Sequence, residues 1–323
     1  MNVRRRHISG VAIAVACALG LTGLTSCTTD SAAAAGAGQF DVVASFYPMA
    51  FLAERIGGGH VHVTSLTKPG QEPHDLEVSV RQRVRLEEAD AVLYLKGLQP
   101  TVDEVVAQSE AKTKIDAAAL TTLERHGTEV GGHAAEHDSD DHGHDHGETA
   151  GKDPHIWLDP VKYAEVARGV GAAFEKADPK HAADYRRNTA ALVGELGELD
   201  TRFREGLAGT GSKVFITTHA AFGYLAERYG LTEEAVSGLD PESEPSVNRV
   251  KDLETMARAD GVTTVFYETL VSDRTARTIA KDAGLKTDVL DPIEGITDSS
   301  RGTDYFSVQE ANLKALQTAL GAK

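Results

Sequence analysis

From Phe40 onward, short apolar runs alternate with stretches of helical periodicity, and this alternation constrains the fold more than any other feature. Strands that alternate with helices form mostly parallel sheets flanked by helices. The runs predict two sets of four strands: Val42–Phe46, Val61–Thr67, Ala91–Lys96 and Lys114–Ala117, then Lys213–Thr218, Ala235–Leu239, Thr263–Glu268 and Thr287–Leu290. We therefore expect an α/β protein with two similar lobes, an N-terminal lobe over residues 40–178 and a C-terminal lobe over residues 209–323.

The segment between the two sets of strands, residues 179–208, predicts one long linking helix. After Asp178-Pro179 no proline interrupts the chain as far as residue 208, and apolar side chains recur on one side of the helix. These side chains are Tyr185, Leu192, Leu196, Leu199 and Phe203. A helix of this length spans roughly 40 Å, which suits a rigid connection between two lobes. An ordinary helix inside one lobe is the alternative.

The N-terminus is typical of an exported bacterial lipoprotein. MNVRRRH is positively charged, and the apolar stretch that follows is too short for a stable membrane span. It ends at Leu24-Thr25-Ser26-Cys27, where small residues precede a cysteine that can be acylated. We expect a signal peptide over residues 1–27, a lipid anchor on Cys27 at the outer face of the cell membrane, and a flexible tether over residues 28–39. An ordinary signal peptide with an incidental cysteine is the alternative.

Cysteine usage and charge restrict the chemistry of the exported part. The chain has two cysteines, Cys17 and Cys27, so nothing after residue 27 can form a disulfide or a thiolate zinc site. The formal net charge of −16 argues against nucleic-acid binding and against broad contact with anionic lipid. Membrane contact is then left to the lipid anchor, and any metal site must use histidine, carboxylate or water ligands.

Residues 124–153 form an acidic, glycine-containing tract with too few apolar residues to fold alone. Imidazole is the commonest metal ligand near neutral pH, so the tract predicts a disordered loop that binds Zn²⁺-type ions weakly at several positions. A solvated loop without metal contact is the alternative. The histidines of this loop are His126, His133, His137, His142, His144 and His146.

Four polar side chains are candidate ligands of a tighter site. His74, His219 and Asp291 follow predicted strands, and His155 stands where the His-rich tract returns to ordered sequence. Ligands of open α/β sheets bind beyond the carboxyl ends of the strands. Three imidazoles and one carboxylate would complete a tetrahedral Zn²⁺ site in the cleft between the lobes. A hydrogen-bonded structural role is the alternative for each residue, and Glu268 occupies a similar strand end.

Several segments together resemble the metal-specific solute-binding proteins of bacterial ATP-binding-cassette (ABC) importers, the zinc and manganese family. They are ASFYPMAFLAERIGG, EPHDLE, DPHIWLDP, DPKHAADYRRN, THAAFGYLAERYGL, GLDPESEPS and VLDPIEG. The resemblance implies two α/β lobes joined by a rigid helix, and metal ligation by His74, His155 and His219 with Asp291 as the matching carboxylate.

Zinc is the metal that this ligand set favours. Manganese-type members usually have glutamate at the position of His219, and more imidazole favours Zn²⁺ over Mn²⁺. In some zinc-type members the fourth ligand is water or a carboxylate close to the first histidine, which makes Glu72 and Glu77 alternatives to Asp291.

The predicted function is that of a surface-anchored, monomeric receptor that captures Zn²⁺ and delivers it to an ABC permease with its ATPase, without enzymatic activity. A manganese or other divalent-metal receptor is the alternative within the family. Outside it, three ligands plus water would suit a zinc hydrolase with Glu268 as base, although the sequence has no His-Glu-x-x-His motif. A metal-buffering adhesin is the remaining alternative.

Overall fold

A computed structural model describes residues 38–130 and 151–322 of the chain. The predicted signal peptide with Cys27, most of the predicted tether, and five histidines of the His-rich tract lie outside the described residues. These histidines are His133, His137, His142, His144 and His146. No helix among the described residues is both long and apolar enough to cross a lipid bilayer.

The first sheet has four parallel strands in the order β2-β1-β3-β4. Alternate side chains of β1 point to opposite faces, so that Val43 packs toward α2 and α3 while Val42 and Ala44 pack toward α1. Burial on both faces explains why the strands read as continuous apolar runs. The elements are β1 Phe40–Ala44, α1 Tyr47–Gly57, β2 Val61–Ser65, α2 Val80–Glu88, β3 Ala91–Tyr94, α3 Pro100–Gln108 and β4 Lys114–Asp116.

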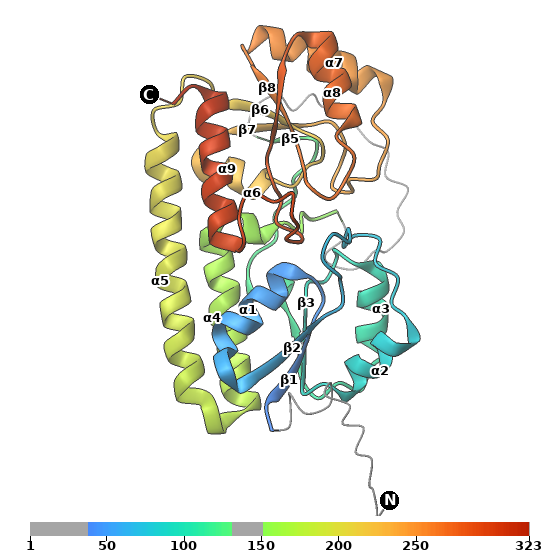
Figure 1. Ribbon diagram of the computed structural model, residues 1–323, viewed down its shortest axis with the longest axis vertical. Helices are drawn as coiled ribbons and strands as arrows, with labels where there is room; N and C mark the ends of the chain where they lie inside the picture. The colour runs from blue at the N-terminus through green and yellow to red at the C-terminus, as the bar shows by residue number, and fades with distance from the viewer. Residues whose placement is uncertain (1–37, 131–150, 323) are drawn as a thin grey trace, which may run out of the picture. The chain divides into compact units, whose positions relative to one another are not determined.

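The second sheet has the order β5-β7-β6-β8-β9, and all its pairs are parallel except that of β5 with β7. Helices α7 and α8 cover one face, and α9 packs on the other (Figure 1). The elements are β5 Glu129–Val130, β6 Val214–Thr217, α6 Gly223–Tyr229, β7 Thr232–Ala235, α7 Val247–Ala259, β8 Thr264–Tyr267, α8 Arg274–Ala283, β9 Lys286–Val289 and α9 Tyr305–Leu320.

The structure differs from the expected strands in two places. The second strand of the C-terminal set lies at β7 rather than at residues 235–239. The apolar pattern did not predict this strand because two of its buried residues are glutamates. Glu233 accepts hydrogen bonds from the Thr217 hydroxyl (2.8 Å) and the Phe222 N–H (3.2 Å), and Glu234 pairs with Arg249 at 2.9 Å. Strand β5 falls inside the tract that was expected to be disordered, and its ladder with β7 orders it.

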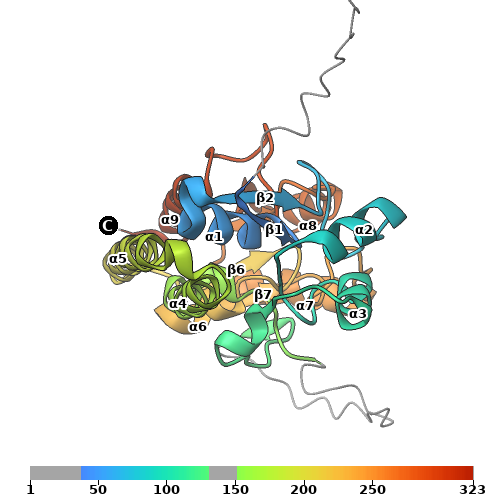
Figure 2. The ribbon, with the colours of Figure 1, turned by 90° about the horizontal axis from the view of Figure 1, so that it is seen from below.

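Helices α4 (Pro160–Ala177) and α5 (Ala182–Leu207) form an antiparallel pair joined by a short turn at Pro179–His181. The 26 residues of α5 span roughly 40 Å. The helix packs on α1 and α4 beside the first sheet and on α6 and α9 beside the second. Figures 1 and 2 agree in placing α4, α5 and α9 on one side of the two sheets and α2 and α3 on the other. The predicted apolar stripe is the buried face of α5.

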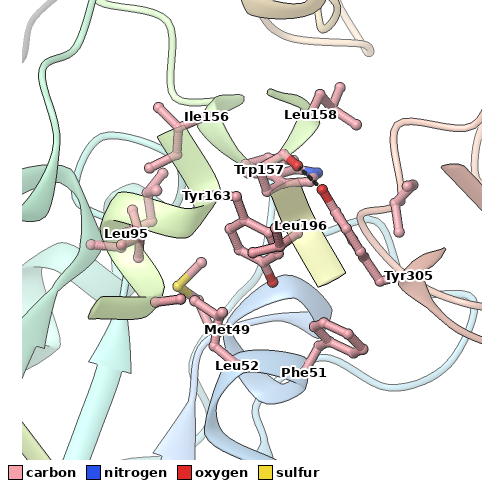
Figure 3. Close-up of a cluster of buried hydrophobic side chains, with 14 of the residues drawn as sticks. Met49, Phe51, Leu52, Leu95, Ile156, Trp157, Leu158, Tyr163, Leu196 and Tyr305 are labelled. Atoms are coloured by element: carbon pink, nitrogen blue, oxygen red, sulfur yellow. Dashed lines mark hydrogen bonds between the residues drawn. The ribbon is translucent and has the colours of Figure 1, made fainter. Parts of the chain in front are cut away.

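One continuous hydrophobic core connects the two sheets through these helices. It includes the fully buried Trp157, in the short 3₁₀ turn Ile156–Leu158 that precedes α4. Side chains from α1, α4, α5 and α9 surround this turn (Figure 3), and the Tyr305 hydroxyl donates a hydrogen bond to the Trp157 carbonyl at 2.6 Å. The two-lobed α/β prediction is confirmed, and the residue next to this turn, His155, is fixed by packing from both lobes.

Candidate metal centre

Three histidines and one glutamate converge between the two sheets: His74, His155, His219 and Glu294, each with a potential donor atom within 4.8 Å of the others. The Oε1 atom of Glu294 lies 3.3, 3.5 and 3.7 Å from the Nε2 atoms of His74, His155 and His219, respectively. A tetrahedral Zn²⁺ with bonds of about 2.1 Å separates its ligand atoms by about 3.4 Å. The glutamate and the imidazoles therefore have the spacing of ligands around one zinc ion.

The fold places three of these four residues beyond the carboxyl ends of strands. His74 lies in the loop after β2, His219 lies two residues beyond β6, and Glu294 follows β9. His155 immediately precedes the 3₁₀ turn at the start of α4, where the buried Trp157 anchors the backbone. Ligand positions beyond strand ends are those expected for open α/β sheets.

The centre is buried and its polar atoms are incompletely satisfied. His155, His219 and Glu294 are almost fully buried, whereas 10 % of the His74 side chain is exposed. Among the described residues, neither Nε2 of His155 nor Nε2 of His219 has a hydrogen-bond partner, and Oε2 of Glu294 has none either. Buried polar atoms without partners are costly. A cation placed between them would satisfy all three residues.

Electrostatics favour protons at this centre when no cation is present. Burial opposes the charged form of His155, but the carboxylates of Asp153 and Glu294 outweigh it and raise the pKa of His155 to about 10. Burial likewise opposes ionisation of Glu294, but His74, His155 and His219 outweigh it and lower the pKa of this carboxyl. The glutamate is therefore a carboxylate, and a binding cation competes with protons for the imidazoles.

Two carboxylates behind the centre orient two of the imidazoles. His155 donates from Nδ1 to Oδ1 of Asp153 at 2.7 Å, and its backbone N–H donates to the same oxygen at 2.8 Å. His219 donates from Nδ1 to Oε1 of Glu268 at 2.7 Å, and the Thr218 hydroxyl donates there at 2.9 Å. With Nδ1 protonated in this way, the neutral imidazole presents the lone pair of Nε2 to the centre.

Asp291, the carboxylate expected as fourth ligand, is not among the four converging side chains. Its oxygens accept hydrogen bonds from the Ile293 N–H (2.8 Å) and the Thr269 hydroxyl (3.2 Å). Ile293 has φ 59° and is the one non-glycine residue with positive φ among the described residues, an unfavourable conformation for a β-branched side chain. Asp291 thus stabilises a strained turn that carries the chain inward to Glu294.

The other carboxylates considered from the sequence also have different neighbours. Glu72 accepts the backbone N–H groups of His74 (3.1 Å) and Asp75 (3.3 Å), so it shapes the turn that presents His74. Glu77 is exposed at the surface. Glu268 contacts His219 on the side away from the centre, which is the position of an orienting acceptor.

Sequence reasoning did not single out Glu294 or Asp153. The expectation placed the carboxylate at the end of the strand, whereas the turn moves it three residues further along VLDPIEG. The signal for Asp153 was its place two residues before His155, a spacing at which a carboxylate can accept from both the backbone and the ring of the histidine.

His126, expected in a mobile metal-collecting loop, is packed beside α6 with only 7 % of its side chain exposed. Its Nδ1 lies 2.7 Å from Oδ2 of Asp153 and its Nε2 lies 3.3 Å from Oε2 of Glu227. Among the histidines of the tract, His126 is the one that the described residues include.

His74 reaches the surface through a cavity of ≈ 300 Å³. Residues of both lobes line it, including Asp75, Lys152, Leu239 and Asp240. The other three converging side chains are almost fully buried, so His74 is the residue of the centre that this cavity reaches.

Comparison with known proteins places this geometry in context. The family model described as "Zinc-uptake complex component A periplasmic" matches residues 42–319. The zinc-binding protein AdcA of Streptococcus pyogenes serotype M3 is 33% identical over 292 residues, which cover 87% of this chain and 56% of AdcA, so the chain spans about half of that relative. The high-affinity zinc uptake system protein ZnuA of Bacillus subtilis is 30% identical over 321 residues and 98% of both chains.

The solved structures include the Zn(II)-bound ZnuA-like domain of Streptococcus pneumoniae AdcA. Its TM-score is 0.71 at 30% sequence identity, over 88% of this chain and 99% of that domain.

Proposed function

The chain belongs to the family of periplasmic zinc-uptake complex component A proteins, and from this premise we propose that it is an extracytoplasmic receptor that binds Zn²⁺ and delivers it to an ABC permease. Proteins of this family are solute-binding receptors that work with such a permease and its ATPase. The observation that carries the proposal is the placement of three imidazole nitrogens 3.3, 3.5 and 3.7 Å from one carboxylate oxygen.

The ligand set supports zinc as the cargo. Three imidazoles and one carboxylate suit Zn²⁺, whereas Mn²⁺ prefers more oxygen ligands. Four protein ligands also complete a tetrahedral shell, and a catalytic zinc keeps one position open for water or substrate. Glu268, the base of the hydrolase alternative, is hydrogen-bonded to His219 instead of lying free beside the centre. These features favour a receptor over a hydrolase.

The route of the ion follows from exposure. Zn²⁺ would enter through the cavity beside His74, where Asp75 and Asp240 outnumber the single cation Lys152 among the described residues that line it. It would bind His74 first and then the buried ligands, displacing protons. The core shared by both lobes and the length of α5 favour small movements of the lobes over a wide hinge. Release would then depend on contact with the permease.

The proposal extends to the location of the protein. An acylated Cys27 would anchor a monomeric receptor to the outer face of the membrane, with a linking helix at residues 179–208 between lobes at 40–178 and 209–323. Metabolic labelling with palmitate, compared between the wild-type protein and Cys27→Ala, tests the anchor. An equal label in both proteins would exclude Cys27 as the acylated residue.

Zinc titration against a chromophoric chelator tests the site. We expect one tight equivalent in the wild-type protein and its loss in His155→Ala. His62→Ala is a matched control, because His62 is a partly exposed histidine of β2 that pairs with Asp41 outside the centre. Unchanged tight binding in His155→Ala would remove this residue from the site. The absence of a tight equivalent in the wild-type protein would overturn the receptor proposal.

A further inference from the structure

One buried carboxylate connects the candidate metal centre to the start of the His-rich tract. Oδ1 of Asp153 accepts from Nδ1 of His155, and Oδ2 of the same side chain accepts from Nδ1 of His126, both at 2.7 Å. The Asp153 side chain is fully buried. Since each imidazole bonds to a different oxygen, the orientation of the Asp153 side chain depends on both His126 and His155.

The surroundings of His126 are shaped for an imidazole ring. The ring forms a T-shaped pair with that of Tyr224, at a centroid distance of 4.6 Å and an interplanar angle of 82°. A Cβ atom at Gly223 would lie 2.6 Å from the His126 ring, so this glycine of α6 makes room for the histidine. A histidine whose only role is to collect ions from solvent needs no such pocket.

The backbone on both sides of the tract is tied together at the same place. The Tyr224 hydroxyl donates to the Asp153 carbonyl and accepts from the Glu124 N–H, both at 2.8 Å. The Asp153 N–H donates to the Glu124 carbonyl at 2.9 Å. Residues 124–126 and 153 therefore form one hydrogen-bonded unit with α6, and this unit includes the acceptor that orients His155.

We propose that His126 is a positioning residue of the zinc site: it holds Asp153 in the orientation that directs His155 toward the ion. The inference rests on the proposed zinc-receptor function and gives His126 a role different from that of a weak ligand in the tract. Without His126, Oδ2 of Asp153 would be buried without this donor, and the carboxylate could rotate away from His155. Loss of an outer partner of a metal ligand, here Asp153, typically lowers metal affinity roughly 10–100-fold, and His126 acts through that partner.

The test compares His126→Ala and His126→Asn in the full chain, with Zn²⁺ affinity from chelator competition and the visible absorption spectrum of the Co²⁺-loaded protein. We expect His126→Ala to weaken the tight site several-fold, up to the roughly 10–100-fold that loss of the outer partner itself causes, and to change the Co²⁺ spectrum. His126→Asn should recover much of both, because its side-chain amide can donate to Asp153 from a position close to that of Nδ1.

Two control variants separate the contact with Asp153 from the contact with Glu227 and from the remainder of the tract. Glu227→Gln alters the exposed partner of His126 and should leave the tight site unchanged. Deletion of residues 131–150 with a short glycine linker retains His126 and should preserve both the affinity and the spectrum.

Distinct outcomes would overturn the inference and the function on which it rests. If the wild-type protein binds zinc tightly and His126→Ala does so with the same affinity and Co²⁺ spectrum, His126 is not a positioning residue. Loss of one weak equivalent alone would make it an auxiliary ligand and would equally reject the inference. If His126→Ala does not fold, the test rests on His126→Asn. An Asn variant that folds but does not bind zinc tightly would contradict the hydrogen-bond mechanism. A wild-type protein without tight binding would reject the proposed function itself.

Discussion

Zinc affinity should rise steeply with pH well above the range in which an ordinary imidazole titrates. Asp153 and Glu294 raise the pKa of His155 to about 10, so the metal-free protein holds a proton on this ring at pH 7.5. Displacing this proton costs about 3 kcal/mol at that pH, since one pH unit corresponds to about 1.4 kcal/mol. The sign is fixed by competition: lowering the pH strengthens proton binding, and zinc binding weakens.

The expected magnitude is about a tenfold increase in apparent affinity for each pH unit between pH 7.5 and 9. A histidine with the ordinary pKa of about 6.5 would give almost no change over this interval. Chelator competition measures the affinity, and calorimetry in buffers of different ionisation enthalpy measures proton release, which should be at least one per zinc at pH 7.5.

Asp153→Asn provides the matched comparison for this prediction. The substitution removes one of the two charges that raise the pKa of His155 and keeps an oxygen that can accept its hydrogen bond, so the pH dependence should move to lower pH. A constant affinity between pH 7.5 and 9 in the wild-type protein, without proton release, would refute the electrostatic reasoning.

Three further perturbations test other parts of the account. Glu294→Gln should lower the zinc affinity, measured by chelator competition, more than about tenfold, because loss of a residue that only contacts a ligand already lowers it about tenfold or more. Glu77→Gln is the control and should leave the affinity unchanged. Asp291→Ala should lower the free energy of unfolding by about 1–3 kcal/mol, measured by urea denaturation, because the buried Ile293 N–H and the partly buried Thr269 hydroxyl lose their acceptor; unchanged stability would contradict its role in the turn. Deletion of residues 131–150 should reduce the number of weak zinc equivalents in calorimetry and keep the tight one; loss of the tight one would show that the tract contributes a ligand.

Periodicity in the sequence was sufficient for most of the architecture. The apolar stripe of α5 and the apolar strands of both sheets are buried by many partners at once, so their pattern does not depend on any single contact. The pattern failed at β7, where Glu233 and Glu234 lie in a buried strand. Their partners Thr217 and Arg249 come from other elements, and local sequence does not contain that information.

The candidate site was predictable in its histidines and less so in its carboxylate. His74 and His219 follow from the rule that ligands gather beyond strand ends, and His155 was predicted from its place where the His-rich tract returns to ordered sequence. The structure brings all three together. The choice between Asp291 and Glu294 depends on the backbone of the turn between them, where Ile293 adopts a positive φ that its residue type does not favour. Tertiary contacts stabilise that conformation, including the hydrogen bond from Trp157 to the Pro292 carbonyl at 2.6 Å.

The role of His126 shows the same limit. In the sequence it is one of six histidines in an acidic tract, with nothing to separate it from the other five. Its contact with Asp153 depends on the approach of α6, which lies about a hundred residues later in the chain. Composition alone therefore assigned His126 the same role as the other five histidines, although His126 has a packed position beside α6.

The most direct measurement is a crystal structure of the zinc-loaded protein with anomalous data collected on both sides of the zinc absorption edge. The account predicts one strong peak between the lobes, bonded at about 2.0–2.2 Å to Nε2 of His74, His155 and His219 and to a carboxylate oxygen of Glu294. A principal peak elsewhere, or one coordinated by fewer than two of these imidazoles, would contradict it.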